Sequence, residues 1–138
     1  MVQISDDFLK EFLKKAKNII IVGASNRPER ASNHIMKFLM DKGYNCYPVN
    51  PMEDEVLGVK AYKSIKDVPV TPDLVDVFRK SEACPEIVKE SVEKGAKFIW
   101  LQENVYSEEA KKIADENNIP IIMDKCIYKE FLRLKVVG

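Results

Sequence analysis

Short apolar runs alternate with amphipathic segments along the whole chain. All but one of the expected strands are nearly continuous in hydrophobic residues, which is typical of strands covered on both faces of a sheet. The strands are expected at residues 18–23, 44–50, 74–78, 97–102 and 119–123. Apolar positions at helical spacing predict helices at about 5–17, 32–42, 85–95 and 125–134, and one more helix behind Ser107. Ser5 and Ser107 are expected to cap the first and the fourth of these helices along the chain.

Strands that alternate with helices pair in parallel through right-handed crossovers. The expected fold class is therefore α/β, a three-layer αβα Rossmann-like sandwich around a five-stranded parallel sheet. Numbered along the chain, the strands are expected in the order 3-2-1-4-5. Gly58, Pro69 and Pro72 interrupt the stretch before the third strand, which leaves room only for a short edge strand near residues 60–62. Without a repeat or linker, residues 1–138 are expected to form a single domain.

Composition and charge argue against several classes of partner. The chain has 22 basic and 22 acidic residues and no block of one sign, whereas nucleic-acid-binding proteins are usually basic overall or in one stretch. No apolar run approaches the roughly 20 residues that cross a membrane. The N-terminus is typical of an amphipathic helix with acidic residues at its start rather than of a signal peptide. We therefore expect no nucleic-acid or membrane partner, and a cytoplasmic location.

The sulfur and imidazole side chains do not suggest a metal site. Cys46, Cys84 and Cys126 lie about forty residues apart, which matches no zinc motif. Because their number is odd, we expect reduced thiols rather than a disulfide framework. His34 is the only histidine, and we expect it at the surface or in a helix cap, with a polar contact to the ligand as the alternative.

In open parallel sheets a ligand lies beyond the carboxyl ends of the strands, where the strand order reverses. Here we expect that crevice between the strands at 18–23 and 97–102. The residues that follow the strands are the candidates for the site, at 23–25, 50–51, 79–81, 102–104 and 124–126. They are far apart in sequence, yet the fold brings them to one edge of the sheet.

The loop after the first strand, GASNRPER, is suited to a phosphate. It offers backbone N–H groups and leads into the start of a helix, where an anion is favoured. Arg27 and Arg30 supply positive charge, and Ser32 or Asn33 is expected to cap the helix. We therefore expect this loop to contact the phosphates of a nucleotide.

Two features argue against an ordinary NAD site. The segment GASNRP has one glycine where a dinucleotide-binding loop has three. The second strand ends in Asn50 and Pro51, where an NAD site has an acid to hold the ribose hydroxyls. An NADP-dependent enzyme stays open as an alternative, because a neutral strand end tolerates a phosphorylated ribose.

Five segments together resemble a known family. They are VGAS with the loop behind it, PVNP at the second strand end, LVDVFRKSE, IWLQ and MDKCI. In this combination they are similar to the small stand-alone CoA-binding proteins, and to the CoA-binding domain of succinyl-CoA synthetase α subunits and ADP-forming acyl-CoA synthetases. The resemblance covers about residues 15–134. It implies that the ligand is coenzyme A or an acyl-CoA.

The resemblance also implies roles for individual residues at the carboxyl edge. Gly23, Ala24 and Ser25 would meet the pyrophosphate or the pantetheine arm. Asn50 and Pro51 would flank the nucleotide, Phe78 and Arg79 would line its other wall, and Gln102 would border the pantetheine. The cationic candidates for the CoA phosphates are Arg27, Arg30, Lys60 and Arg79.

A binding role without catalysis is the expectation that these residues support. The sequence has no P-loop, no HExxH and no Ser–His–Asp set, and the related ligases need a second domain with a phosphorylated histidine. Family members often have a histidine soon after MDxC, where this chain has Phe131. A carrier, a sensor or a subunit with a protein partner all fit. The alternatives are an NAD(P)-binding oxidoreductase and a redox protein that joins the CoA thiol to Cys126.

Overall fold

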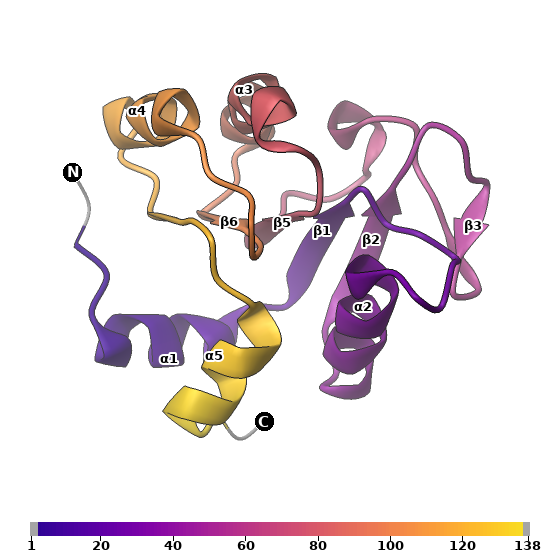
Figure 1. Ribbon diagram of the computed structural model, residues 1–138, viewed down its shortest axis with the longest axis horizontal. Coiled ribbons are helices and arrows are strands. Elements are labelled where there is room, and N and C mark those ends of the chain that lie inside the picture. Colours follow the sequence, from indigo (N-terminus) through magenta and orange to yellow (C-terminus); the bar gives the residue numbers. More distant parts are fainter. Residues whose placement is uncertain (1–2, 137–138) are drawn as a thin grey trace.

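The structure is a computed structural model that describes residues 3–136. Its centre is a parallel sheet in the order β2-β1-β5-β6-β7 (Figure 1). The strands are β1 (Asn18–Val22), β2 (Asn45–Val49), β5 (Leu74–Val77), β6 (Phe98–Leu101) and β7 (Ile121–Ile122). The fold class, a Rossmann-like α/β sandwich with five parallel strands, is confirmed.

One strand does not lie where the predicted order placed it. Segment 74–78 was expected at the edge beyond β2, but β5 pairs with β1 on the side away from β2. The place beyond β2 is taken by a single parallel bridge between Val49 and Tyr62. Numbered along the chain, the five strands alone run 2-1-3-4-5, and when this bridge is counted as the third strand the order becomes 3-2-1-4-5-6, which contains the predicted run 3-2-1-4-5 with β7 added. A strand this short carries almost no hydrophobic pattern, so segment 74–78 was numbered one place too early.

Helices cover both faces of the sheet. On one face lie α1 (Asp6–Lys15), α2 (Ala31–Asp41) and α5 (Ile127–Leu134), and on the other lie α3 (Cys84–Lys94) and α4 (Glu108–Glu116) (Figure 1). Because side chains alternate along a strand, Ile19 and Ile21 pack toward the first set of helices and Ile20 and Val22 toward the second. The two cores therefore share one sheet.

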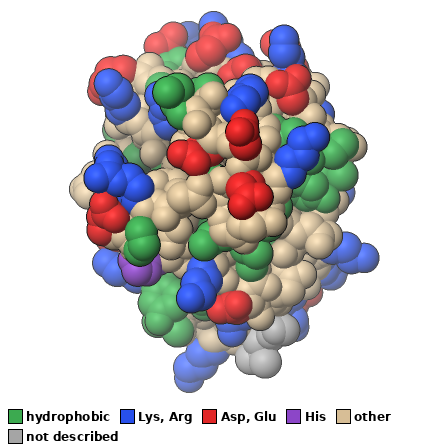
Figure 2. Space-filling view, turned by 90° about the vertical axis from the view of Figure 1, so that its right-hand side faces the viewer, with side chains coloured by type: hydrophobic (Ala, Val, Ile, Leu, Met, Phe, Trp, Pro, Cys, Tyr) green, Lys and Arg blue, Asp and Glu red, His purple; other side chains and the backbone are tan. Residues whose placement is uncertain are grey.

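The chain leaves the sheet between β2 and β5. Here a small antiparallel hairpin forms from β3 (Glu55–Val56) and β4 (Val59–Lys60), followed by a 3-10 turn, η1 (Ile65–Asp67). A second 3-10 turn, η2 (Ser81–Ala83), leads into α3. Figure 2 shows the side of the molecule on which the hairpin lies, with Lys and Arg interspersed with Asp and Glu over its surface.

Two predicted helix caps are present and one is not. Ser5 accepts a hydrogen bond from the Phe8 N–H at 3.0 Å, and Ser107 caps α4 in the same way. Neither Ser32 nor Asn33 caps α2, because the helix begins earlier and its N-cap residue is Arg30. Asn33 instead lies within the first turn, where its side chain is free to bond to the preceding loop.

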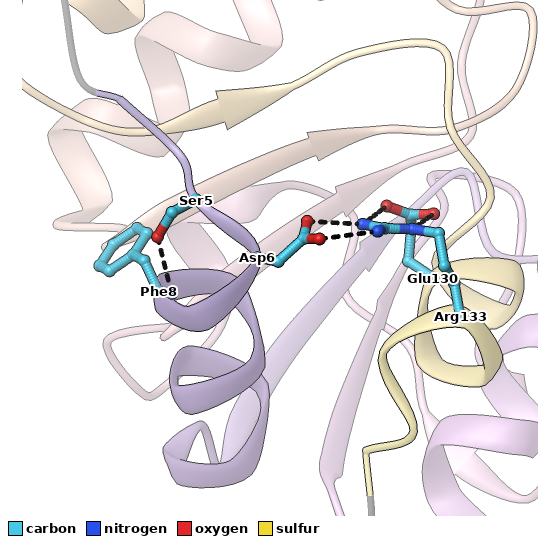
Figure 3. A network of polar contacts seen from close by, with 5 residues as sticks. All are labelled: Ser5, Asp6, Phe8, Glu130 and Arg133. Carbon is cyan, nitrogen blue, oxygen red and sulfur yellow. Dashed lines mark hydrogen bonds and ion pairs between the residues drawn. The ribbon is translucent and has the colours of Figure 1, made fainter.

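A polar network joins the N-terminal helix to the C-terminal one (Figure 3). Arg133 of α5 donates two hydrogen bonds to the Asp6 carboxylate, at 3.0 and 2.9 Å. The same guanidinium also donates to both oxygens of Glu130, at 3.1 and 2.9 Å. The hydrogen bonds to Asp6 and, to a smaller extent, to Glu130 raise the pKa of Arg133 above its usual value.

Among residues 3–136, no helix is long and apolar enough to cross a membrane.

Candidate functional site

A cavity of about 700 Å³ opens at the carboxyl edge of the sheet. Its wall includes residues that follow all five strands, which agrees with the expected composite site. Nine of the residues predicted for the site line it: Gly23, Ser25, Arg27, Arg30, Asn50, Phe78, Arg79, Gln102 and Cys126. The strand order reverses between β1 and β5, not between β1 and β6 as expected, since β5 lies next to β1.

Three predicted residues do not line the cavity. Ala24 belongs to the loop after β1, but its side chain is completely buried in the core. Pro51 and Lys60 are exposed, and the Lys60 ammonium lies 5.4 Å from the centre of the Tyr62 ring. Lys60 belongs to the β3–β4 hairpin. The sequence of this hairpin shows no regular spacing of hydrophobic residues, so its position relative to the cavity could not be predicted.

The backbone turns sharply at Gly23, where β1 ends. The residue has a φ of 86°, a conformation that side chains with a Cβ rarely adopt. A Cβ at this position would lie 3.0 Å from both the Phe78 carbonyl oxygen and Arg79 Cδ. Only glycine therefore lets the first loop pass close to the end of β5.

Positive charge in the cavity is partly neutralised. Arg27 forms an ion pair with Glu29 at 3.1 Å, with both side chains largely exposed. No ion pair among residues 3–136 engages the other two arginines of the cavity wall, Arg30 and Arg79. These two guanidinium groups are thus available to an anionic ligand.

Gln102 is held in a buried chain of hydrogen bonds. Its Nε2 donates to Asp76, and its Oε1 accepts from the Ile127 N–H at 3.3 Å. Asp76 is wholly buried on β5, and its second carboxylate oxygen has no hydrogen-bond partner among residues 3–136. Burial raises the pKa of Asp76 to about 7, and the hydrogen bond from Gln102 opposes this shift. The orientation of the Gln102 amide is therefore set from behind the cavity.

The three thiols differ in their environments. Burial raises the pKa of Cys46 to about 12, and the nearby Asp76 charge contributes to this shift as the smaller cause. Burial, and then Glu82, raises the pKa of Cys84 to about 11. Cys126 is only partly buried, precedes α5 as its N-cap residue and lines the cavity. It is the cysteine of the cavity wall, as predicted from its place after the last strand.

Glu103, from the candidate segment 102–104, also lines the cavity, and six further residues of the wall were not assigned to the site: Ala31, Ser32, His34, Ile35, Glu53 and Val105. Four of them belong to the first turns of α2, whose start near the loop could have suggested them. His34 is exposed at this rim, as expected. Glu53 lies three residues after Asn50 and accepts a hydrogen bond from Asn26 at 2.7 Å.

Among residues 3–136, no three His, Cys, Asp or Glu side chains are grouped to hold a metal ion.

Comparison with known proteins identifies relatives of this chain. The sequence profile described as CoA binding domain matches residues 17–131. The Bacillus subtilis protein YneT is 43% identical over 119 residues, which are 86% of this chain and 88% of YneT. The ADP-forming acetate–CoA ligase of Methanocaldococcus jannaschii is 32% identical over 129 residues. A hypothetical protein from Pyrococcus horikoshii has a solved structure with a TM-score of 0.92 at 43% identity, covering 96% of this chain and 93% of that one.

The extent of these matches differs. The chain spans most of YneT and of the Pyrococcus horikoshii protein, but only 18% of the length of the acetate–CoA ligase. The region matched by the family profile begins after α1 and contains every residue that lines the cavity. The chain belongs to the family of CoA-binding domains.

Proposed function

We propose that this protein binds coenzyme A, or an acyl-CoA, in the carboxyl-edge cavity, and that it acts in the cytoplasm as a carrier, a sensor or a subunit rather than as an enzyme. The observation that carries the proposal is the pair Arg30 and Arg79, two arginines without an ion pair among residues 3–136, in the wall of this cavity. CoA is a polyanion with a long flexible arm. It needs convergent cations and an extended cleft, and membership of a CoA-binding family favours it over other nucleotides.

In this proposal each part of CoA meets a different strand end. The phosphates lie near the loop at Gly23 and Ser25 and near the two free arginines. Gln102 contacts the pantetheine arm, whose amides match its side-chain amide. Cys126 lies toward the thiol end.

A thermal-shift titration with CoA, NAD and NADP tests the proposal. A ligand at 100 times its Kd adds about 2.7 kcal/mol of stability, which raises the Tm of a domain of this size by roughly 8–10 °C. We expect this rise with CoA. A rise with NADP alone would replace the proposal by a dinucleotide-dependent enzyme, and no rise with CoA would contradict it.

A matched pair of variants locates the site. Arg79→Ala removes a cation from the cavity wall. Lys80→Ala is the control, because Lys80 is the exposed neighbour of Arg79 and does not line the cavity. We expect R79A to weaken CoA binding about tenfold, because a hydrogen bond to a charged group contributes roughly 1.5–3 kcal/mol. The K80A protein should bind CoA as the wild type does.

Cys126 supports a second candidate, a redox protein that holds CoA covalently. The Cys126 thiolate would attack one sulfur of CoA disulfide, so that a mixed disulfide forms and one CoA thiolate leaves. Such exchange requires an accessible thiolate. Cys126 is the thiol in the cavity wall, while Cys46 and Cys84 are buried with raised pKa values.

Mass spectrometry after treatment with CoA disulfide tests this candidate. A mixed disulfide would add one CoA to the peptide that contains Cys126, and dithiothreitol would remove it. The Cys126→Ser protein serves as the control, since it keeps the size of the side chain. A Cys126 peptide that stays unmodified would exclude the redox candidate and leave reversible CoA binding untouched.

A further inference from the structure

Two asparagine side chains from different elements hold the loop that follows β1. Asn50, at the end of β2, donates from its Nδ2 to the Ala24 carbonyl oxygen at 2.8 Å. Asn33, in the first turn of α2, donates from its Nδ2 to the Ser25 carbonyl oxygen at 2.9 Å. Successive carbonyl groups of the loop are thus turned toward fixed donors.

The orientation of these carbonyls decides where the loop presents its N–H groups. In a trans peptide the C=O and the N–H of one peptide unit point in opposite directions, and the described chain contains no cis bond. When the Ala24 and Ser25 carbonyls point to the asparagines, the N–H groups of Ser25 and Asn26 point away from them. No hydrogen bond among residues 3–136 occupies either N–H.

The asparagine side chains are themselves fixed. The Asn50 Oδ1 accepts from the Met52 N–H at 2.8 Å, so a flip of the amide would break two hydrogen bonds. Asn33 is buried, with 8% of its surface exposed. Backbone N–H groups that are directed in advance favour an anion, because little ordering is left for the moment of binding.

We propose that Asn33 and Asn50 are positioning residues that direct the Ser25 and Asn26 N–H groups toward the diphosphate of the bound ligand. The proposal rests on the proposed function, because it requires an anionic nucleotide in the cavity. The asparagines act through the backbone of the loop. Their own donor hydrogens to Ala24 and Ser25 are engaged inside the protein.

Alanine substitutions and NMR together test this role. Asn33→Ala and Asn50→Ala each remove a donor to the loop without adding charge. Asn45→Ala is the matched control, because Asn45 begins β2 at the end of the strand opposite Asn50, and among residues 3–136 its side chain bonds only to the side chain of Asn18. We expect the Kd for CoA, measured by titration calorimetry, to rise about tenfold in N33A and N50A and to stay unchanged in N45A.

The NMR readout separates positioning from general damage to the fold. On addition of CoA to the wild-type protein, the amide protons of Ser25 and Asn26 should shift downfield, as expected for hydrogen bonds to phosphate. In N33A and N50A these shifts should shrink while the remaining spectrum stays dispersed.

Four outcomes of these experiments are distinguishable. CoA binding to the wild type without a shift of the Ser25 and Asn26 amides overturns the inference, as does unchanged affinity in both variants. A wild-type protein that does not bind CoA contradicts the proposed function instead. A variant that loses its dispersed spectrum is replaced by Asn→Ser at the same position, which keeps a short donor, and restored affinity there supports the inference.

Discussion

Gly23 occupies a position that strongly restricts substitution. Its φ of 86° and the 3.0 Å approach to the Phe78 carbonyl oxygen act together against a Cβ. We expect Gly23→Ala to lower the free energy of unfolding by about 1–3 kcal/mol and to abolish the CoA-induced thermal shift. The loop would have to move away from the end of β5, where the ligand is proposed to lie.

Gly43 provides the control for this prediction. It also has a positive φ, of 99°, but a Cβ there would meet nothing within 4 Å. Gly43→Ala should therefore lower the free energy of unfolding by about 1 kcal/mol, measured by urea titration, and leave CoA binding intact. Equal effects of both substitutions on CoA binding would show that the close approach at Gly23 is unimportant.

Asp76 makes stability depend on pH. Its pKa is raised from 3.8 to about 7 by burial, so the folded protein binds a proton that the unfolded chain has released over this interval. The free energy of unfolding should therefore fall as pH rises from about 4 to 7, by at most about 1.4 kcal/mol per pH unit, and level off above. Cys46 is the titratable neighbour that shares this face, and its pKa lies far above this range.

Asp76→Asn isolates this contribution. The asparagine keeps an acceptor for Gln102 but does not titrate, so the fall between pH 4 and 7 should be reduced relative to the wild type. Asp7→Asn is the control, because Asp7 is an exposed carboxylate on α1. Urea titrations at several pH values measure the difference, and parallel curves for wild type and D76N would contradict the prediction.

At the scale of elements, Arg133 of α5 joins α1 through its hydrogen bonds to Asp6. Glu130 is nearly buried and accepts two hydrogen bonds from Arg133, whereas Asp6 is mostly exposed. We expect Arg133→Ala to lower the Tm more than Asp6→Ala does, because only the first leaves a buried carboxylate without its partner. The effect of D6A should vanish in 1 M salt, since exposed pairs are screened.

Lys14→Ala is the comparison for these variants. Within the described residues, Lys14 pairs only with Glu11 of its own helix, at 3.6 Å, and this pair joins no second element. The Tm of the K14A protein, measured by differential scanning calorimetry, should equal that of the wild type. If the Tm of R133A equalled that of K14A, the contact between α1 and α5 would not depend on the Arg133 guanidinium.

Most elements were predictable from local pattern, and the exceptions have local causes. The apolar runs at β1, β5 and β6 and the caps at Ser5 and Ser107 are visible in sequence because burial on both faces and helix capping restrict residue type directly. The β3–β4 hairpin has two-residue strands, too short to show a period. The Val49–Tyr62 bridge at the edge of the main sheet is shorter still, which is why segment 74–78 was numbered as the third strand.

At the scale of the molecule, one sheet supports two cores, so we expect them to unfold together. Trp100 is fully buried on the face covered by α1, α2 and α5, and Leu101 is fully buried on the opposite face. Leu101→Ala should lower the free energy of unfolding by about 2–5 kcal/mol. Urea transitions followed by Trp100 fluorescence and by far-UV circular dichroism should coincide before and after the substitution.

Separate transitions would contradict this expectation. They would mean that the helices on the two faces unfold as independent units, and that residues 1–138 do not behave as the single domain expected from sequence. The control is Lys111→Ala, whose ion pair with Asp115 lies within α4 and should leave both probes unchanged.

The sequence by itself determined the alternation of strands and helices, and with it the edge at which a ligand site forms. Hydrophobic period and strand-to-helix order are local properties, and parallel topology then brings strand ends together. Only the tertiary structure decided that β5 lies beside β1, that Lys60 stands apart from the cavity while Glu53 and His34 reach it, and that Asn33 and Asn50 bond to the loop. These outcomes depend on contacts between distant segments, and a pattern along one segment does not encode its neighbour in space.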